Sequence, residues 1–426
     1  MLKILNKFNI LQKNQQTQRG AVLMVMLVIL IVGGSALLLN SLSNTSLRTE
    51  RDKKTADALA QAKEALIGYA ANNDPPGRLP CPENTVFIGT STEGQQISNC
   101  GNGVSIGRLP WRTLGVGPIR DSSGEPLWYA ISPGFRKPLI TSPPINSDSL
   151  AQLTIDGVPN SAVAIIFSAG PPINGQIRPV PTALAALDPA QYLELSNNVA
   201  NSTAFVSNGP STTFNDRLLI VTHSDLFRVV EKRVAKEVVN SLNEYYCGAG
   251  NVNPAGGCLA VGGNRFYPRP ADFTDANCLG NFSIASMPIA TSCPSSALNK
   301  GRIPAHPATD WDITSLLYGS NSSLWFQKNG WREVVFYAVA TTCADGTTNC
   351  GGGSGNLTLN DPPGSTLLNQ KVVVIVTGSA IPTQLHTTGN KNTISNYLED
   401  ENLAPFDDTF TKKTASPFND IAISIP

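Results

Sequence analysis

An uncharged apolar run near the N-terminus constrains this chain more than any other feature. No charged residue occurs between Arg19 and Arg48, and residues 21–39 form its apolar core. As a helix, this core would reach roughly 28 Å, about the thickness of the hydrocarbon layer of a bilayer. The sequence therefore predicts a membrane-spanning helix, followed by a long polar region.

The residues before this run predict its orientation. The leader contains basic residues and no acidic ones; the basic residues are Lys3, Lys7, Lys13 and Arg19. Positive charge on one flank holds that flank in the cytoplasm. The bulk of the chain is therefore expected on the outer side of the membrane.

Three interpretations of the run compete. It could be a signal anchor or a secretory signal peptide, but the apolar stretch is long for a signal peptide and no clear Ala-x-Ala site follows it. In the third interpretation, the basic leader, the Arg19-Gly20 pair and the apolar run beginning at Ala21 resemble a type IV prepilin or a type II secretion pseudopilin. This resemblance implies that a membrane aspartyl peptidase cuts after Gly20 and methylates the amine of Ala21.

The chain departs from the usual pilin pattern directly after the junction. Major pilins continue with a Phe-Thr-Leu-Ile-Glu-like run, whereas Val25 stands here at the position of the glutamate. In the family, that glutamate is thought to pair with the N-terminal amine of a neighbouring subunit. Its absence favours a position at the tip or start of a filament over the filament body.

Length and composition predict two domains with real cores. The 426 residues exceed one typical domain, and 41% of them are apolar. Basic and acidic residues balance at 31 each, so nothing in the charge indicates a nucleic-acid partner. The 36 glycines and 31 prolines are typical of a turn-rich, β-containing region.

The cysteines predict structural disulfides. All eight follow the apolar run, which places them in an oxidising compartment, and no Cys-x-x-Cys motif occurs. Sequence alone cannot choose among their connectivities. Their clustering favours pairing between neighbours: Cys81–Cys100, Cys247–Cys258, Cys278–Cys293 and Cys343–Cys350.

The first helix is expected to continue beyond the membrane. Residues 41–67 contain no proline or glycine, and apolar residues recur with a helical period at Leu59, Ala62, Leu66 and Ala70. Pro75 and its successor would end the helix. The sequence thus predicts one spine helix over residues 21–74, apolar first and amphipathic later.

Further motifs extend the prepilin resemblance. They are Ala65-Leu66-Ile67-Gly68-Tyr69-Ala70, Gly77-Arg78-Leu79-Pro80-Cys81-Pro82, Gly107-Arg108-Leu109-Pro110-Trp111 and Glu125-Pro126-Leu127-Trp128-Tyr129-Ala130. Together they resemble a family of large prepilin-type proteins of Gram-negative bacteria. The resemblance covers roughly residues 18–225.

The chain also repeats itself. The second half opens with an amphipathic pattern from Leu226 to Tyr245, then echoes earlier motifs in the same order. The echoes are Gly301-Arg302-Ile303-Pro304 for 107–110, residues 334–339 for 127–131, 371–378 for 162–170, Tyr397-Leu398-Glu399 for 192–194, and Phe418-Asn419-Asp420 for 214–216. This predicts two copies of one helix-plus-sheet unit. The paired Tyr-Leu-Glu and Phe-Asn-Asp motifs are interpreted as a repeated turn and cap.

The search for catalytic chemistry yields little. The histidines are His223, His306 and His386, far apart in sequence, and no metalloprotease or nucleophile-elbow motif occurs. His223-Ser224-Asp225 has the residue types of a triad, but adjacent residues cannot adopt triad geometry, so it is interpreted as a helix cap. Acidic clusters at 400–401 and 407–408, a loop at 344–349 and a tryptophan platform remain weaker candidates for calcium or glycan binding.

These observations predict an α+β fold, in which a long N-terminal membrane-spanning helix precedes two tandem pilin-like domains, each a helix with an antiparallel sheet. The expected parts are a leader (1–20), the spine helix (21–74), a first head domain (75–225) and a duplicated second one (226–426). The domains follow from the repeats and the periodicity, and the leader follows from the resemblance.

The predicted function is that of a non-enzymatic minor pilin or pseudopilin-like subunit, without cofactor or metal. It would be inserted in the bacterial inner membrane, processed after Gly20, and assembled into or placed at the end of a filament. Its expected partners are the prepilin peptidase, other pilin subunits and the membrane, but not nucleic acid. The alternative is an unprocessed, membrane-anchored periplasmic binding or adhesive protein; a periplasmic enzyme is a weaker third.

Overall fold

The computed structural model describes the chain from residue 46 to its end, with gaps. The described residues are 46–100, 105–136, 144–173, 175–178, 188–248, 251–253, 258–259, 265–274, 298–304, 325–344, 350, 355–362, 364–387, 390–403, 408–412 and 418–426.

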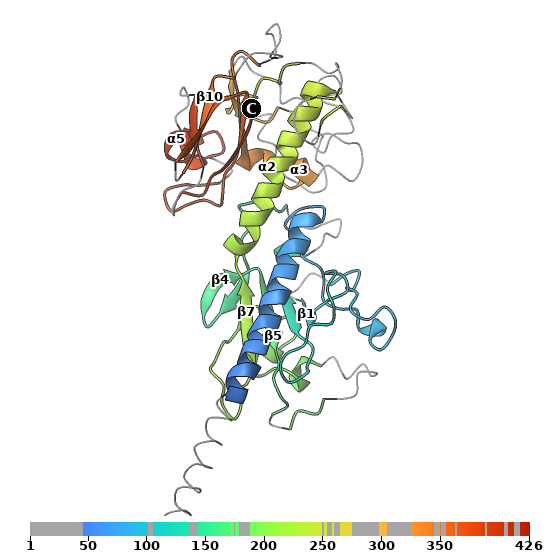
Figure 1. The fold of residues 1–426 in the computed structure, drawn as a ribbon. Helices are drawn as coiled ribbons and strands as arrows, with labels where there is room; N and C mark the ends of the chain where they lie inside the picture. The colour runs from blue at the N-terminus through green and yellow to red at the C-terminus, as the bar shows by residue number, and fades with distance from the viewer. Residues whose placement is uncertain are drawn as a thin grey trace, which may run out of the picture.

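The first half packs one helix against one sheet (Figure 1). The helix spans residues 46–72. The antiparallel sheet has the order β1 (Ser105–Arg108), β2 (Trp128–Ile131), β5 (Ala164–Ser168), β7 (Arg217–Val221). Apolar residues on the helix, including Ala62 and Leu66, share one buried core with Tyr129 and Ile166 of the sheet. Alternation along each strand sends these two side chains toward the helix.

The second half repeats this arrangement. Helix α2 (His223–Cys247) contacts a four-stranded antiparallel sheet of order β8 (Lys300–Arg302), β9 (Val335–Val339), β12 (Val372–Val376), β14 (Ile421–Ile425). In both halves, the four strands of this sheet lie side by side in the order in which they occur along the chain. Val234, Val238 and Leu242 recur at four-residue spacing on the buried face of α2.

Each half also contains a smaller sheet that includes a parallel strand pair. In the first half, β3 (Leu153–Ile155) pairs with β4 (Val158–Ala162) in a hairpin and with β6 (Ala204–Phe205) in parallel. In the second half, β10 (Leu357–Asp361) pairs in the same way with β11 (Ser365–Gln370) and β13 (Thr409–Thr411). The remaining short elements are η1 (Thr85–Phe87), η2 (Pro133–Phe135), η4 (Pro189–Gln191), η5 (Leu195–Asn198), α3 (Trp325–Lys328), α4 (Trp331–Val334), η8 (Ile394–Asn396) and α5 (Asp400–Leu403).

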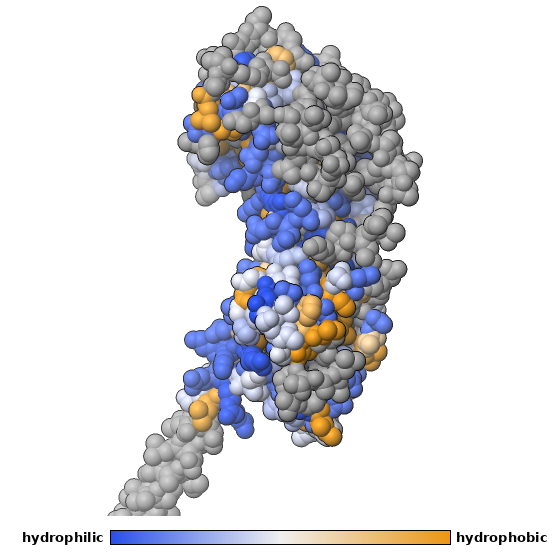
Figure 2. Space-filling model, turned by 90° about the vertical axis from the view of Figure 1, so that its right-hand side faces the viewer, coloured by the Kyte–Doolittle hydropathy of each residue, from blue (hydrophilic) through white to orange (hydrophobic). Residues whose placement is uncertain are grey.

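The two halves are joined without a linker. Strand β7 ends at Val221, Thr222 caps the next helix, and α2 begins at His223. Across the junction, Lys63 of the first helix donates to the carboxylate of Asp225 at 2.7 Å. Figure 1 shows the halves stacked end to end, with both long helices along the length of the molecule, and Figure 2 shows a hydrophilic band where they meet.

A second set of contacts holds the junction from the side of α2. Arg233 donates to the carbonyl oxygens of Ala71 and Asn73 at 2.7 and 2.8 Å and to the carboxylate of Asp74 at 2.6 Å. These acceptors follow or end the first helix, where carbonyls lack partners within the helix. A cation at a helix C-terminus also interacts favourably with the helix dipole.

The predicted fold class is wrong in two respects. In the described chain, the first helix is seen only from residue 46, and no helix is both long and apolar enough to cross a membrane. The physical reason is that this helix opens with charged residues, from Arg48 to Lys54, and is therefore amphipathic. Each half also carries a second sheet with parallel pairing, so sheets dominate the regular structure. Residues 21–45 lie outside the described residues.

Candidate functional site

Some of the residues predicted to carry function lie outside the described residues, and the others can be placed. Those outside are Gly20, Ala21, Val25, Cys278, Cys293 and His306. Of the predicted cysteine pairs, the structure contains the disulfides Cys81–Cys100, Cys247–Cys258 and Cys343–Cys350. None of these three links the two halves.

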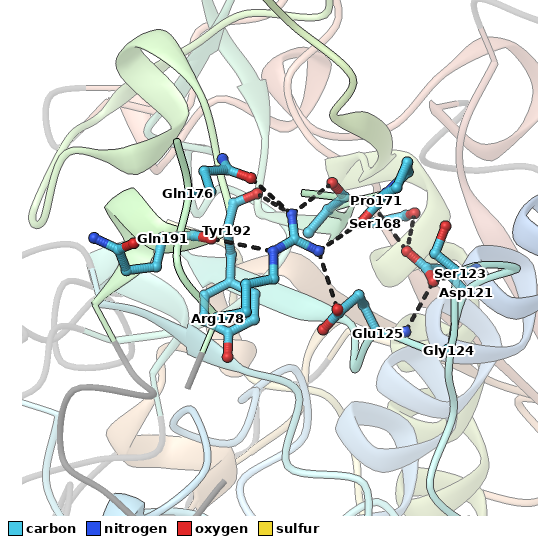
Figure 3. A network of polar contacts seen from close by, with 12 residues as sticks. Asp121, Ser123, Gly124, Glu125, Ser168, Pro171, Gln176, Arg178, Gln191 and Tyr192 are labelled. Atoms are coloured by element: carbon cyan, nitrogen blue, oxygen red, sulfur yellow. Dashed lines mark hydrogen bonds and ion pairs between the residues drawn. The ribbon is translucent and has the colours of Figure 1, made fainter. Parts of the chain in front are cut away.

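A polar network surrounds Arg178 in the first half (Figure 3). Its guanidinium donates to the side chain of Gln176 at 2.9 Å, approaches the carboxylate of Glu125 at 3.2 Å, and lies 5.0 Å from the ring centre of Tyr192. It also donates to the carbonyl oxygens of Ala169, Gly170, Gln191 and Tyr192. Because one side chain contacts so many segments, Arg178 fixes the loop that follows β5.

Asp121 completes this network from the turn before β2. One of its carboxylate oxygens accepts hydrogen bonds from the backbone of Ser123 and Glu125, and the other accepts from the Ser168 hydroxyl at 2.8 Å and the Gly170 amide at 3.0 Å. Asp121 is buried, so these four donors replace its hydration. The carboxylate has a full set of partners from the chain itself.

A pair of carboxyl groups adjoins this network through Gln176, whose side-chain amide donates to Glu194 Oε1 at 2.8 Å. Glu194 Oε2 accepts hydrogen bonds from the backbone amides of Asn215 and Asp216 at 3.0 and 3.2 Å. In return, Asp216 Oδ2 accepts from the Glu194 amide and the Asn197 side chain, both at 3.0 Å. The reciprocal bonds tie the loop before β7 to the start of η5.

The second half repeats this carboxyl pair residue for residue. Glu399 Oε2 accepts from the amides of Asn419 and Asp420, while Asp420 Oδ2 accepts from the Glu399 amide and the Asn402 side chain. The repeated Tyr-Leu-Glu and Phe-Asn-Asp motifs thus lie together in both halves. Their role is that of a brace before the last strand, β7 or β14.

Burial shifts the acid strength of this pair. Desolvation raises the pKa of Asp216 to about 8, against an ordinary value of about 3.9, and raises the pKa of Asp420 well above its ordinary value. Among the residues that the structure describes, the remaining oxygen, Oδ1, has no hydrogen-bond partner in either Asp216 or Asp420. An unpartnered buried oxygen is costly for a carboxylate and much less so for a protonated carboxyl.

The raised pKa predicts a pH-dependent stability. Because folded Asp216 holds its proton more tightly than the unfolded chain does, its stabilising effect is complete below pH about 4 and is lost as the pH rises toward about 8. The contribution of Asp216 to the free energy of unfolding should fall by up to about 1.4 kcal/mol per pH unit in this window. Asp216→Asn should flatten the profile, and adding Asp420→Asn should flatten it further, as measured by urea unfolding at pH 5 to 8 with tryptophan fluorescence.

Asp57→Asn is the matched control, because it removes one exposed carboxyl from the first helix. This variant should keep the pH profile of the unmodified chain. An unchanged profile in the Asp216→Asn, Asp420→Asn double variant would contradict the assignment of protonated carboxyls to this brace.

The Gly-Arg-Ile-Pro motif of the second half places a buried arginine among aromatic rings. The guanidinium of Arg302 lies 4.6, 5.2 and 5.3 Å from the ring centres of Phe273, Phe336 and Tyr397. It donates to three carbonyl oxygens, those of Arg332, Glu333 and Lys391. Desolvation lowers the pKa of Arg302. The cage joins β8 to α4 and to the loop before η8.

The structure brings two histidines, predicted to lie in different elements, to the same loop. His386 Nδ1 contacts the carboxylate of Asp148, and His223 interacts with the backbone of Ser147. Burial is the largest influence on His223 and lowers its pKa. No sequence spacing could signal this proximity, because the shared loop belongs to the other half of the molecule.

Other candidates are placed in structural roles. Thr222, rather than Ser224, caps α2, and Asp225 closes the capping box. Trp128, Trp325 and Trp331 are buried, so they cannot form an exposed platform. Within the described residues, no group of three or more His, Cys, Asp or Glu side chains could hold a metal ion.

The geometry therefore favours bracing over chemistry in the described chain. Asp121, Glu194 and Asp216 are buried and accept hydrogen bonds from the chain's own donors, an arrangement that stabilises loops. Comparison with protein-family models, with curated proteins and with solved structures finds no match for this chain.

Proposed function

We propose that this chain is a minor pilin or pseudopilin-like structural subunit. The observation that carries the proposal is the Arg19-Gly20-Ala21 junction, where a basic leader meets an apolar run without any charge up to Arg48. The chain would enter the bacterial inner membrane through this run and be processed after Gly20. It would then join or cap a type IV pilus or a type II secretion-like filament.

The folded part supports this role in its architecture. Two helix-plus-sheet halves, stacked along the molecule and braced by buried carboxyl pairs, make a long head suited to projecting from an anchored segment (Figure 1). The three disulfides among the described residues add stability suited to an oxidising compartment. Val25 in place of the family's glutamate favours a tip or initiating position.

The N-terminus of the mature protein tests the proposal. Mass spectrometry of membrane and filament fractions should find a methylated Ala21 in cells with the prepilin peptidase and the intact leader in cells without it. Gly20→Val should abolish cleavage, because a branched side chain then stands at the scissile bond. Gly33→Val, within the apolar run, should leave cleavage unchanged. A leader retained in the presence of the peptidase would instead favour the anchored binding protein.

A further inference from the structure

A groove runs beside α2 in the second half. It has a volume of about 1220 Å³, and its lining comes mainly from α2, the edge strand β14 and the small sheet, with Gly378, Ser379 and Asn419 from the loops beside them. The small sheet contributes Asp361 and Leu367, and Lys412 follows it. Both polar and apolar side chains are therefore available to an occupant.

One border of the groove is an unpaired sheet edge. Strand β14 is the last strand of its sheet, and among the described residues it pairs with β12 alone. In the part of the chain that the structure describes, no hydrogen bond reaches the outer edge of β14. Such an edge can accept an extended peptide as an additional strand.

The helix beside this edge carries a row of cations. Arg228, Lys232 and Lys236 are spaced by four residues, which places them on one face of α2, and all three are exposed. Among the described residues, none of the three forms an ion pair. The row therefore offers its positive charge to a partner.

The acidic residues that line the groove are already engaged. Asp225 pairs with Lys63, and Asp361 pairs with Lys412. Glu231 is buried and has interactions of its own. What remains for an occupant is the row of three cations, which complements a negatively charged segment.

The first half carries an ion pair at the corresponding edge. There, Arg217 of edge strand β7 forms an ion pair with Asp52 of the first helix at 2.6 Å. In the second half, Ile421 occupies the strand position of Arg217. When the two helices are aligned by matching Leu66 with Leu242, Arg228 occupies the position of Asp52. The second half thus lacks this bridge between helix and edge strand.

We infer that the groove binds an extended acidic segment of a partner protein, which adds as a strand to β14. Its carboxylates face Arg228, Lys232 and Lys236. Because side chains alternate along a strand, the intervening residues point the other way, toward Leu367 of the small sheet. The segment therefore alternates acidic with apolar residues. The inference does not depend on the filament role.

The probe is a capped nine-residue peptide of alternating glutamate and valine, titrated against the full-length chain in detergent. We expect saturable binding that weakens with added salt. Replacing Arg228, Lys232 and Lys236 by alanine together should weaken binding about tenfold, the combined effect of three exposed ion pairs. N-methylation of alternate peptide amides should abolish binding, because those amides donate the strand hydrogen bonds.

The matched control removes the same charges elsewhere. Arg51, Lys53 and Lys54 on the first helix are exposed, and replacing them by alanine should leave the affinity unchanged. Any of three results would overturn the inference: no binding of the peptide, equal binding of its lysine–valine or N-methylated counterpart, or equal binding by the α2 variant. Self-association of the chain that the α2 substitutions abolish would also overturn it, because a second copy would then occupy the groove.

Discussion

Gly301→Ala should destabilise the second half by about 3 kcal/mol. An added Cβ would lie 2.0 Å from the carbonyl oxygen of Ala271, and that oxygen accepts a hydrogen bond from the Arg302 amide at 3.1 Å. The clash is with backbone, so two paired segments would have to separate. Thermal unfolding of the full-length chain should show a decrease of roughly 6–12 °C in the transition that reports the second half.

The equivalent glycine of the first half provides an informative comparison. A Cβ on Gly107 would lie 2.8 Å from the side chain of Pro82, so Gly107→Ala should have a smaller effect, about 1–2 kcal/mol. Gly117→Ala is the control, because no atom lies within 4 Å of the added carbon. If the Gly301→Ala protein unfolds at the same temperature as the Gly117→Ala protein, the close-approach explanation of this motif is refuted.

Arg302→Lys should cost about 3 kcal/mol despite keeping the positive charge. The guanidinium is planar, and it lies against Phe273, Phe336 and Tyr397 while it donates to three carbonyl oxygens. An ammonium group is not planar and cannot make both sets of contacts. Some of these buried acceptors would lose their donor. The urea midpoint of the second half should therefore fall clearly.

Arg228→Lys is the matched control, since Arg228 is exposed on α2 and the change should stay within about 0.5 kcal/mol. Arg302→Met should cost more than Arg302→Lys, because it removes the guanidinium donor from all three carbonyl oxygens and removes a buried positive charge near Glu333. Equal midpoints for the Arg302→Lys and Arg228→Lys proteins would show that the cage is not a significant source of stability.

Sequence patterns predicted the elements whose signal is local. The apolar period from Leu226 to Tyr245 lies within α2, and the apolar runs near 164 and 372 lie in β5 and β12. The described disulfides join neighbours in the cysteine clusters. Local spacing carries this information because helical and strand periods are set within a few residues.

The rest depended on contacts between distant segments. The parallel pairs β3–β6 and β10–β13 join short strands about fifty residues apart in sequence, and β11 has five exposed residues out of six. The carboxyl pairs were visible as repeated motifs, but their reciprocal hydrogen bonds were not. The meeting of His223 and His386 at Ser147 and Asp148 required the packing of one half on the other.

The direct passage from β7 into α2 has a mechanical consequence. Only Thr222 lies between strand and helix, and Lys63 and Arg233 form hydrogen bonds across the junction. The second half is therefore not joined to the first by a flexible linker. A force applied to the second half is transmitted along β7. The hydrogen bonds between β7 and β5 are perpendicular to this force, so they are loaded together in shear. The head would therefore respond to tension as one stiff rod, not as two bodies swivelling on a hinge.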